Sequence, residues 1–364
     1  MGKTLGTVWD LEPHTAKKHE ILRRYCEAWL PIMARWNSRV LYIDGFAGPG
    51  KYSKGEDGSP VIVLKAARDH TYQIKSEFVC LFIEAELPRF RHLEKVLEEI
   101  RPTLTSNIKF TAVHGVFNEQ MTQVFNLLQE QKKTRAPTLV FVDPFGFSHT
   151  PFSTIAKIME NQKCETIVNF MYEEINRFLS HSDHAGNFDA LFGTQAWRQV
   201  LEITNPDERL RFVHDLYLEQ LRAAAKYVRS FQMVNRGNRT DYFLFFATND
   251  LTGLRKMKES MWRVDQSGGA HFSDYTDSLG LRPLFQSEPN YVELRKLITG
   301  QFAGKQVTID ELEDWVTADT PYLPSHLRKK VLIPMENEGA LEVVQSGKKR
   351  RRGTFPSGTM LQFR

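Results

Sequence analysis

The sequence predicts an α/β fold in which a mostly parallel sheet is followed by a small α+β domain. Apolar runs of four to six residues alternate with amphipathic helical segments, as expected for parallel strands that are buried on both faces. Beyond about residue 286 the pattern changes to three short helices and two strands. A chain of 364 residues is also long for one domain. We therefore expect two domains, over residues 1–285 and 286–364.

A glycine-rich turn follows the first predicted strand. The apolar run Val40–Ile43 ends at Asp44, and Gly45, Gly48 and Gly50 follow within six residues. Glycine adopts positive φ angles and lets the backbone approach a ligand that a Cβ atom would keep away.

A helix is expected to begin just beyond this turn, with Ser59 as its N-cap and Pro60 in its first turn. A strand, a glycine turn and a helix N-terminus together suit a nucleotide-like cofactor. The glycines do not have the NAD spacing, and Lys51 is followed by Tyr52 rather than by the Ser or Thr of a phosphate-binding loop.

Polar residues also end the second and third predicted strands. The second strand, 78–83, ends at Glu84, whose carboxylate could accept both ribose hydroxyls of a nucleoside. Glu86 is the alternative for this role. The third strand, 108–113, leads to His114 and the apolar Val116.

The fourth predicted strand, 138–142, ends in Asp143-Pro144-Phe145-Gly146. An Asp-Pro turn that caps a strand is common, so the tetrapeptide is informative only because it stands at this strand end. The fifth strand, 166–171, contains Asn169, which needs hydrogen-bond partners if it is buried. Beyond this strand, Glu173, Asn176 and Arg177 could face either solvent or the cleft, and the sequence favours neither. An antiparallel hairpin is expected at 227–234 and 241–248.

An amphipathic helix is expected over residues 14–36, before the first strand. Thr15, Lys18 and His19 lie on its first turns, where they either face solvent or cap a site.

Composition predicts a soluble chain that stays in the cytoplasm. No run of eighteen apolar residues and no signal-peptide core is present. Cys26, Cys80 and Cys164 are few and far apart, so we expect buried thiols and neither a disulfide framework nor a metal site.

The C-terminal region has a concentrated positive charge. A basic run stands between two predicted strands, 340–344 and 359–363, and the nearby Glu336, Glu338 and Glu342 are too few to pair all of it. Phosphates are its expected partners, although a solvated loop is the alternative. The residues expected to contact nucleic acid are Lys348, Lys349, Arg350, Arg351 and Arg352.

The sequence D-G-F-A-G-P-G resembles the first motif of class I S-adenosylmethionine (SAM) methyltransferases, which have a Rossmann-like sheet with a C-terminal antiparallel hairpin. The resemblance implies SAM as the cofactor. It places Asp44 near the ammonium group of SAM, Glu84 on the ribose, and His114 and Val116 near the adenine. The glycine turn and helix start would hold the methionine part, through Gly45, Phe46, Ala47, Gly48, Gly50 and Ser59.

Asp-Pro-Phe-Gly resembles the D/N-P-P-Y/F turn of methyltransferases that act on exocyclic nitrogens of DNA or RNA bases, with the second proline missing. This implies that Asp143 and Pro144 accept hydrogen bonds from the target amine and that Phe145 stacks on the base.

The ordered stretches W-D-L-E-P-H-T-A-K-K-H, Y-I-D-G-F-A-G-P-G-K-Y, V-D-P-F-G, N-F-M-Y-E-E-I-N-R and M-W-R-V-D resemble the bacterial three-Cys-motif partner (TcmP) family over nearly the whole chain. The resemblance implies a methyltransferase-like domain with a C-terminal winged-helix domain, and a partner protein with a three-cysteine, iron–sulfur-type motif. Two functions remain: a SAM-dependent methyltransferase that acts on a base nitrogen, or a non-catalytic nucleic-acid-binding adaptor that docks a partner enzyme.

Overall fold

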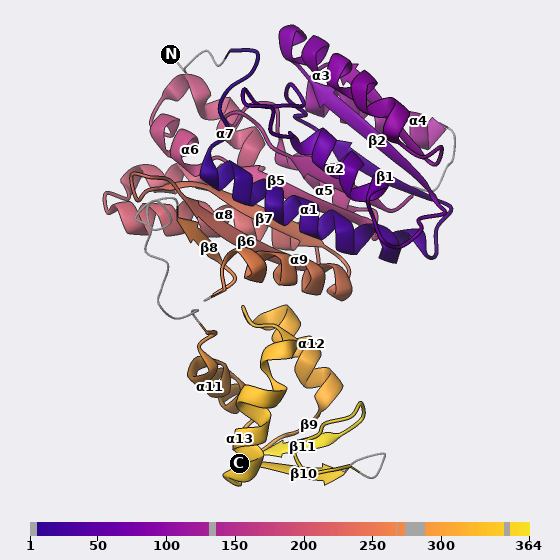
Figure 1. The fold of residues 1–364 in the computed structure, drawn as a ribbon. Coiled ribbons are helices and arrows are strands. Elements are labelled where there is room, and N and C mark those ends of the chain that lie inside the picture. The colour runs from indigo at the N-terminus through magenta and orange to yellow at the C-terminus, as the bar shows by residue number, and fades with distance from the viewer. Residues whose placement is uncertain (1–5, 131–135, 267, 274–287, 346–349) are drawn as a thin grey trace. The chain divides into compact units, whose positions relative to one another are not determined.

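The computed structural model describes residues 6–130, 136–266, 268–273, 288–345 and 350–364, and these form two compact units (Figure 1). The first unit contains the described residues up to Lys256, together with Phe272 and Ser273. The second contains Met257–His271 and the described residues from Glu288 onward. Each unit is considered by itself.

The first unit is built on an eight-stranded sheet with the order β3-β2-β1-β4-β5-β7-β6-β8. The strands β1 to β5 pair in parallel, whereas β7 is antiparallel to both β5 and β6. This confirms the predicted Rossmann-like fold class, with its antiparallel hairpin at the end of a parallel sheet. The strands are β1 (Arg39–Asp44), β2 (Glu77–Glu84), β3 (Ile108–His114), β4 (Thr138–Val142), β5 (Cys164–Phe170), β6 (Tyr227–Val234), β7 (Thr240–Thr248) and β8 (His271–Ser273).

Helices cover both faces of this sheet because its strands are apolar on both sides. The strands β4 and β5 are buried along their whole length. The α-helices are α1 (Pro13–Ala34), α2 (Ser59–Arg68), α3 (Leu87–Ile100), α4 (Phe117–Glu130), α5 (Phe152–Met159), α6 (Tyr172–Phe178), α7 (Ala185–Phe192), α8 (Pro206–Ala224) and α9 (Leu251–Val264). Short 3-10 turns are η1 (Arg101–Thr103), η2 (Ser182–His184) and η3 (Ala196–Glu202).

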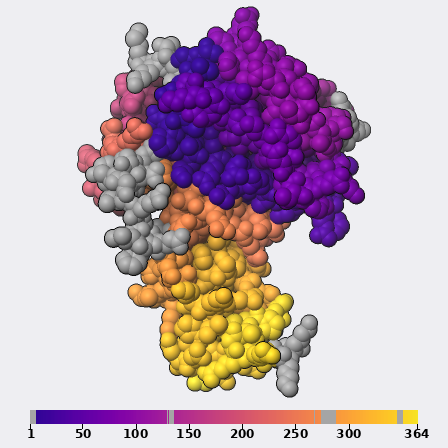
Figure 2. Space-filling model, in the orientation of Figure 1, coloured from indigo at the N-terminus to yellow at the C-terminus, as the bar shows by residue number. Residues whose placement is uncertain are grey.

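The helices α4, α5, α7 and α8 share one apolar cluster with the sheet. Phe117 of α4, Phe188 of α7 and Tyr217 of α8 are fully or almost fully buried in it. The helices α1 and α2 pack against each other in front of the sheet in Figure 1, and α1 forms part of the surface drawn in indigo in Figure 2. The helix α1 therefore covers the sheet on one side and is open to solvent on the other.

The second unit combines short helices with a three-stranded antiparallel sheet of order β10-β11-β9. Thr308 caps α12 and forms the expected capping box with Glu311. The elements are α11 (Tyr291–Phe302), β9 (Gln306–Thr308), α12 (Ile309–Asp319), η4 (Pro324–His326), the π-helical η5 (Arg328–Leu332), α13 (Ile333–Asn337), β10 (Leu341–Gln345) and β11 (Met360–Phe363).

The structure corrects one element of this unit. A helix over 325–338 with an interruption at Pro334 was expected, whereas the chain forms η4, a π-helical stretch and then α13. Pro334 lies in the first turn of α13. Because proline lacks the N–H group and its ring clashes with the carbonyl one turn earlier, a regular α-helix cannot continue through it.

The C-terminal part of α9 belongs to the second unit. Residues 257–271 group with the second unit because Lys258 and Trp262 of α9 belong to its interior. The Lys258 ammonium donates to the carbonyl oxygens of Val316, Thr317 and Thr320 at 2.8 to 3.0 Å.

The three cysteines are buried free thiols, as expected. Within the described ranges, none of the helices combines the length and the apolar character that crossing a membrane requires.

Candidate cofactor and substrate site

The site lies where the strand order reverses. The strands β1 and β4 are parallel neighbours in the middle of the sheet, and the chain turns toward opposite edges from them. A crevice forms outside the carboxyl ends of the strands at such a switch point, and ligands of open α/β sheets bind there. Asp44 is the last residue of β1 and Asp143 directly follows β4, so both stand at this crevice.

A small pocket at this position collects many of the predicted site residues. It contains the glycine turn, the start of α2 and the Asp143 turn, which come from distant parts of the sequence. From the predicted set it is lined by Phe46, Ala47, Gly48, Gly50, Ser59, Asp143 and Phe145. Its other lining residues are Trp9, His19, Pro49, Lys51, Tyr52 and Gly58.

The glycine turn requires glycine at two of its positions. Gly48 has φ of 63° and Gly50 has φ of 82°, a region that side chains other than glycine disfavour. A Cβ atom at Gly50 would also lie 3.0 Å from a methyl group of Leu93. The turn is therefore held in one conformation, and Gly48 lines the pocket with its backbone because it has no side chain.

Asp44 is a completely buried carboxyl group. Burial raises the pKa of Asp44 to about 7, while hydrogen bonds from the Ser59 side chain and the Phe46 N–H oppose the rise. A buried carboxylate is costly unless a positive charge or further donors compensate it. Asp44 is thus suited to a cationic group in the adjacent pocket.

The structure corrects the role of Ser59 at the start of α2. The N-cap is Gly58, which has extended backbone angles, and Ser59 is the first helical residue. The Ser59 hydroxyl is therefore not used to cap the helix and instead bonds Asp44.

Glu84 ties the end of β2 to the glycine turn. Its Oε2 accepts from the Gly48 N–H at 2.8 Å, and its Oε1 accepts from the Glu86 N–H at 2.8 Å. Burial raises the pKa of Glu84, although these two backbone donors oppose the rise. Each carboxylate oxygen has a second lone pair, so Glu84 can still accept two hydroxyl groups. The side chain of Glu86 is exposed.

Asp143 is held by two side chains that lie far away in the sequence. The Lys18 ammonium of α1 is 2.6 Å from both carboxylate oxygens, and the Asn169 amide of β5 donates to Oδ1 at 2.6 Å. Lys18 is only 5% exposed and also lies 5.1 Å from the centre of the Tyr242 ring. The carboxylate is thereby fixed and neutralised, and Oδ2 keeps a lone pair for a further donor.

Aromatic and cationic side chains surround the outer part of the pocket. The Trp9 and Phe145 rings meet edge to face at 5.1 Å, and the Arg89 guanidinium lies about 5 Å from the centre of each. The Ser53 N–H donates to the Trp9 carbonyl at 2.9 Å, which holds the chain before α1 on the glycine loop. Phe145 is 54% exposed, so a planar ligand has access to its ring.

His19 of α1 lines the same pocket and is 5% exposed. Burial lowers the pKa of His19 to about 3, the Lys18 charge lowers it further, and the Asp143 charge opposes this. The imidazole is therefore neutral at physiological pH. Tyr52, whose ring lies 5.7 Å from that of His19, has a pKa raised by burial and stays protonated.

Six predicted site residues are not among those that line this pocket: Asp44 and Glu84, described above, and Gly45, His114, Val116 and Pro144. His114 bonds the Ala85 carbonyl at 2.9 Å and stacks near Phe90. Gly45 packs so closely that a Cβ atom would lie 2.4 Å from the Phe117 ring. Pro144 is buried, and Val116, which lies two residues beyond the end of β3, is half-buried.

The predicted basic tip divides into two parts. Lys348 and Lys349 lie outside the described residues. Arg350 is not a free charge, because it pairs with the largely buried Glu336 and lies 5.6 Å from the centre of the Phe355 ring. Arg351 and Arg352 are the remaining candidates for phosphate contacts.

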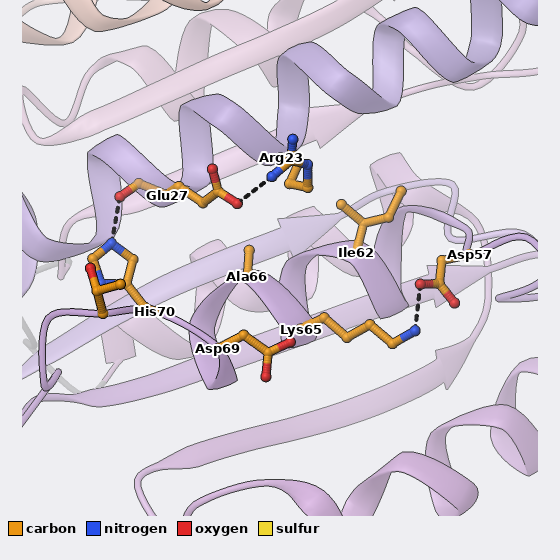
Figure 3. A pocket seen from close by; sticks show the side chains of 9 residues that line it. Arg23, Glu27, Asp57, Ile62, Lys65, Ala66, Asp69 and His70 are labelled. Atoms are coloured by element: carbon orange, nitrogen blue, oxygen red, sulfur yellow. Dashed lines mark hydrogen bonds and ion pairs between the residues drawn. The ribbon is translucent and has the colours of Figure 1, made fainter.

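A second hollow lies between α1 and α2, and its charged side chains have partners among the described residues (Figure 3). Asp69 in this hollow pairs with Arg68. In this hollow Arg23 pairs with Glu27 at 2.6 Å, and Lys65 pairs with Asp57 at 2.6 Å. The His70 ring bonds the Glu27 carbonyl at 2.8 Å. The switch-point pocket is therefore the better candidate site.

Sequence reasoning did not place Trp9, Tyr52 and Arg89 in the site. Trp9 belongs to the quoted motif W-D-L-E-P-H, and Tyr52 lies two residues beyond Gly50, so position along the chain was a usable signal for both. Arg89 on α3 gave no such signal.

The solved structures that are similar to part of the chain include the following three. An O-methyltransferase from Bacillus cereus in complex with SAH is 14% identical, with 66% of this chain and 82% of that chain covered and a TM-score of 0.35. Human methyltransferase-like protein 13 in complex with SAH is 11% identical, with 70% and 92% covered and a TM-score of 0.34. The SAH-bound Podospora anserina methyltransferase PaMTH1 is 11% identical, with 68% and 100% covered and a TM-score of 0.29. No protein-family model and no curated protein matches the chain.

Proposed function

We propose that this protein is a SAM-dependent methyltransferase that acts on an exocyclic amine of a nucleic-acid base. The observation that carries the proposal is the single switch-point pocket into which the glycine turn and the Asp143 turn both open. One turn offers backbone and the buried Asp44 to a cationic cofactor. The other offers a fixed carboxylate and an exposed aromatic ring to a planar amine.

SAM would lie along the glycine turn. Its ammonium group would approach Asp44, where a positive charge compensates the cost of the buried carboxylate. Its ribose hydroxyls would donate to the free lone pairs of Glu84, whose orientation the Gly48 and Glu86 amides already fix. The sulfonium supplies an activated methyl group, so the protein has mainly to position the acceptor.

The target amine would lie at Asp143. Lys18 and Asn169 hold the carboxylate in place, and Oδ2 can accept an N–H of the amine. Phe145 would stack on the base, in part by displacing the Arg89 guanidinium from its ring. A nucleobase supplies both the amine and the planar ring that this arrangement fits.

The second unit supports a nucleic-acid target through its order of elements. A helix, a short strand, the helical elements α12 to α13 and two strands follow one another, an order similar to that of a winged-helix domain. Arg351 and Arg352 follow β10, where such a domain has its wing. Replacement of both by Ala should make the slope of log affinity against log salt less negative by about two units on duplex DNA. An unchanged slope would exclude these arginines as phosphate contacts.

The direct experiment is titration of the purified full chain with SAM and with SAH by calorimetry, followed by transfer from methyl-tritiated SAM to mixed-sequence DNA and RNA oligonucleotides. The proposal expects binding of both cofactors and label in at least one nucleic acid. Asp44→Asn should weaken SAM binding, whereas Glu165→Gln, which changes a buried carboxyl outside the pocket, should not. Nucleic-acid binding without SAM binding at millimolar concentration would instead favour the adaptor. Co-purification from cells that contain the three-Cys-motif protein tests whether that protein is a partner.

A further inference from the structure

His19 has a buried nitrogen that the fold leaves without a partner. The side chain is 5% exposed, and its Nδ1 makes no hydrogen bond. A buried polar atom without a partner is destabilising, so native structures seldom retain one that does not meet a ligand or water. His19 lines the pocket that contains Asp143, so its ring borders the space in which a ligand would lie.

The other buried histidine of α1 shows what a structural histidine looks like in this fold. The His14 Nε2 lies 3.1 Å from the Asp241 carboxylate, and the ring packs against Tyr242. His14 does not line the pocket. The contrast between the two histidines therefore separates a packing role from a role toward a ligand.

Asp143 is poorly suited to take up a proton itself. Its two oxygens already accept three hydrogen bonds, two of them from the Lys18 ammonium. The carboxylate can orient an amine, but a proton released in the reaction needs another acceptor.

We propose that His19 is a catalytic residue that accepts the proton released by the methylated amine, at Nδ1. This inference rests on the proposed function. The lone pair of the amine attacks the methyl carbon of SAM, the carbon–sulfur bond breaks, and its electron pair stays on sulfur to give neutral SAH. The amine nitrogen, now positively charged, transfers one N–H proton to Nδ1. The imidazolium that forms then lies near the Asp143 carboxylate and later releases the proton to water.

The weak basicity of His19 is compatible with this step. The buried ring is neutral at physiological pH, so its nitrogen is not blocked by a proton beforehand. A methylated exocyclic amine of a base is a strong acid while it bears the positive charge, because protonation removes its conjugation with the ring. Even a weak base then accepts its proton, and general-base catalysis of this kind contributes about 10² to 10⁴ in rate.

The test compares three variants in single-turnover transfer from methyl-tritiated SAM to whichever DNA or RNA oligonucleotide the wild-type chain labels. His19→Asn and His19→Ala should lower the rate constant at least about 100-fold, with SAM affinity within a few-fold of wild type. His14→Asn should leave the rate within a few-fold. Added imidazole should partly restore His19→Ala. An unchanged rate in both His19 variants would overturn the inference while leaving the methyltransferase function intact.

A second measurement does not depend on turnover. The ¹⁵N imidazole signals of His19 in the full chain should show an unprotonated Nδ1 and a protonated Nε2 from pH 5 to pH 8. A proton on Nδ1 would overturn the inference, because that nitrogen could not accept another. If the wild-type chain binds SAM but labels neither nucleic acid, the proposed target is wrong, and this measurement still decides whether Nδ1 is free to accept a proton.

Discussion

Replacement of Asp44 by Asn tests the electrostatic basis of the cofactor site. Asp44 is completely buried, and its pKa is raised from 3.8 to about 7. The folded state therefore binds more protons than the unfolded state between these two values, and the group's contribution to stability falls as pH rises through this range. Asn has a similar shape and no charge, so the variant removes this dependence.

The expected size follows from the two pKa values. Full ionisation of the buried group costs about 4 kcal/mol, since each pKa unit corresponds to about 1.4 kcal/mol. About 2 kcal/mol of this cost is already present at pH 5, because the unfolded carboxyl is ionised there. The stability of Asp44→Asn relative to wild type should therefore increase by about 2 to 3 kcal/mol between pH 5 and pH 8.

The assay must report on the first unit alone. Hydrogen exchange of the amides of β1, measured from pH 5 to pH 8 and corrected for the intrinsic rate, gives the free energy of opening of this region. Glu165→Gln is the matched control. Glu165 is buried between Tyr25 and Thr248, and its pKa is also raised to about 7. The stability of Glu165→Gln relative to wild type should therefore increase with pH by a similar amount.

Ligand binding separates the two variants. Asp44→Asn should weaken SAM binding by about 10-fold to 150-fold, the equivalent of about 1.5 to 3 kcal/mol for a hydrogen bond to a charged group. Glu165→Gln should bind SAM as wild type does. If the free energy of opening of β1 depended on pH in the same way in wild type and in Asp44→Asn, a raised pKa at Asp44 would be refuted. Equal SAM binding by both variants would refute its role toward the ammonium group.

Four further substitutions, one of them a control, probe other contacts of the two units. Glu84→Ala should weaken SAM binding by about 1.5 to 3 kcal/mol in calorimetry, and Glu86→Ala should not; the reverse result would mean that the ribose carboxylate is Glu86. Lys18→Met leaves the Asp143 carboxylate without its cation and should lower the stability of the first unit by about 3 kcal/mol in urea unfolding. A stability within about 1 kcal/mol of wild type would count against a buried ion pair. Arg350→Ala should destabilise the second unit by about 1 to 3 kcal/mol because it leaves Glu336 unpaired; loss of nucleic-acid binding at unchanged stability would instead make Arg350 a phosphate contact.

The sequence by itself determined the elements and the parts of the site that depend on neighbouring residues. The alternation of apolar strands and helices predicted the parallel sheet, and the capping box at Thr308 predicted the start of α12. The glycine turn is equally local, because the positive φ angles of Gly48 and Gly50 are open to glycine and disfavoured for other residues. Such features follow from backbone sterics and hydrogen bonding within a few residues.

Only the tertiary structure decided which side chains meet. Lys18 and Asp143 are 125 positions apart, and no spacing rule connects a helix before the first strand with the end of the fourth. The pairing of Arg350 with Glu336 depends in the same way on how the last strands fold back on α13. The neutral state of His19 and the raised pKa of Asp44 are also properties of the packed interior, because the removal of water shifts both groups toward their uncharged forms. Sequence patterns describe contacts along the chain, whereas burial and charge pairing arise from contacts across it.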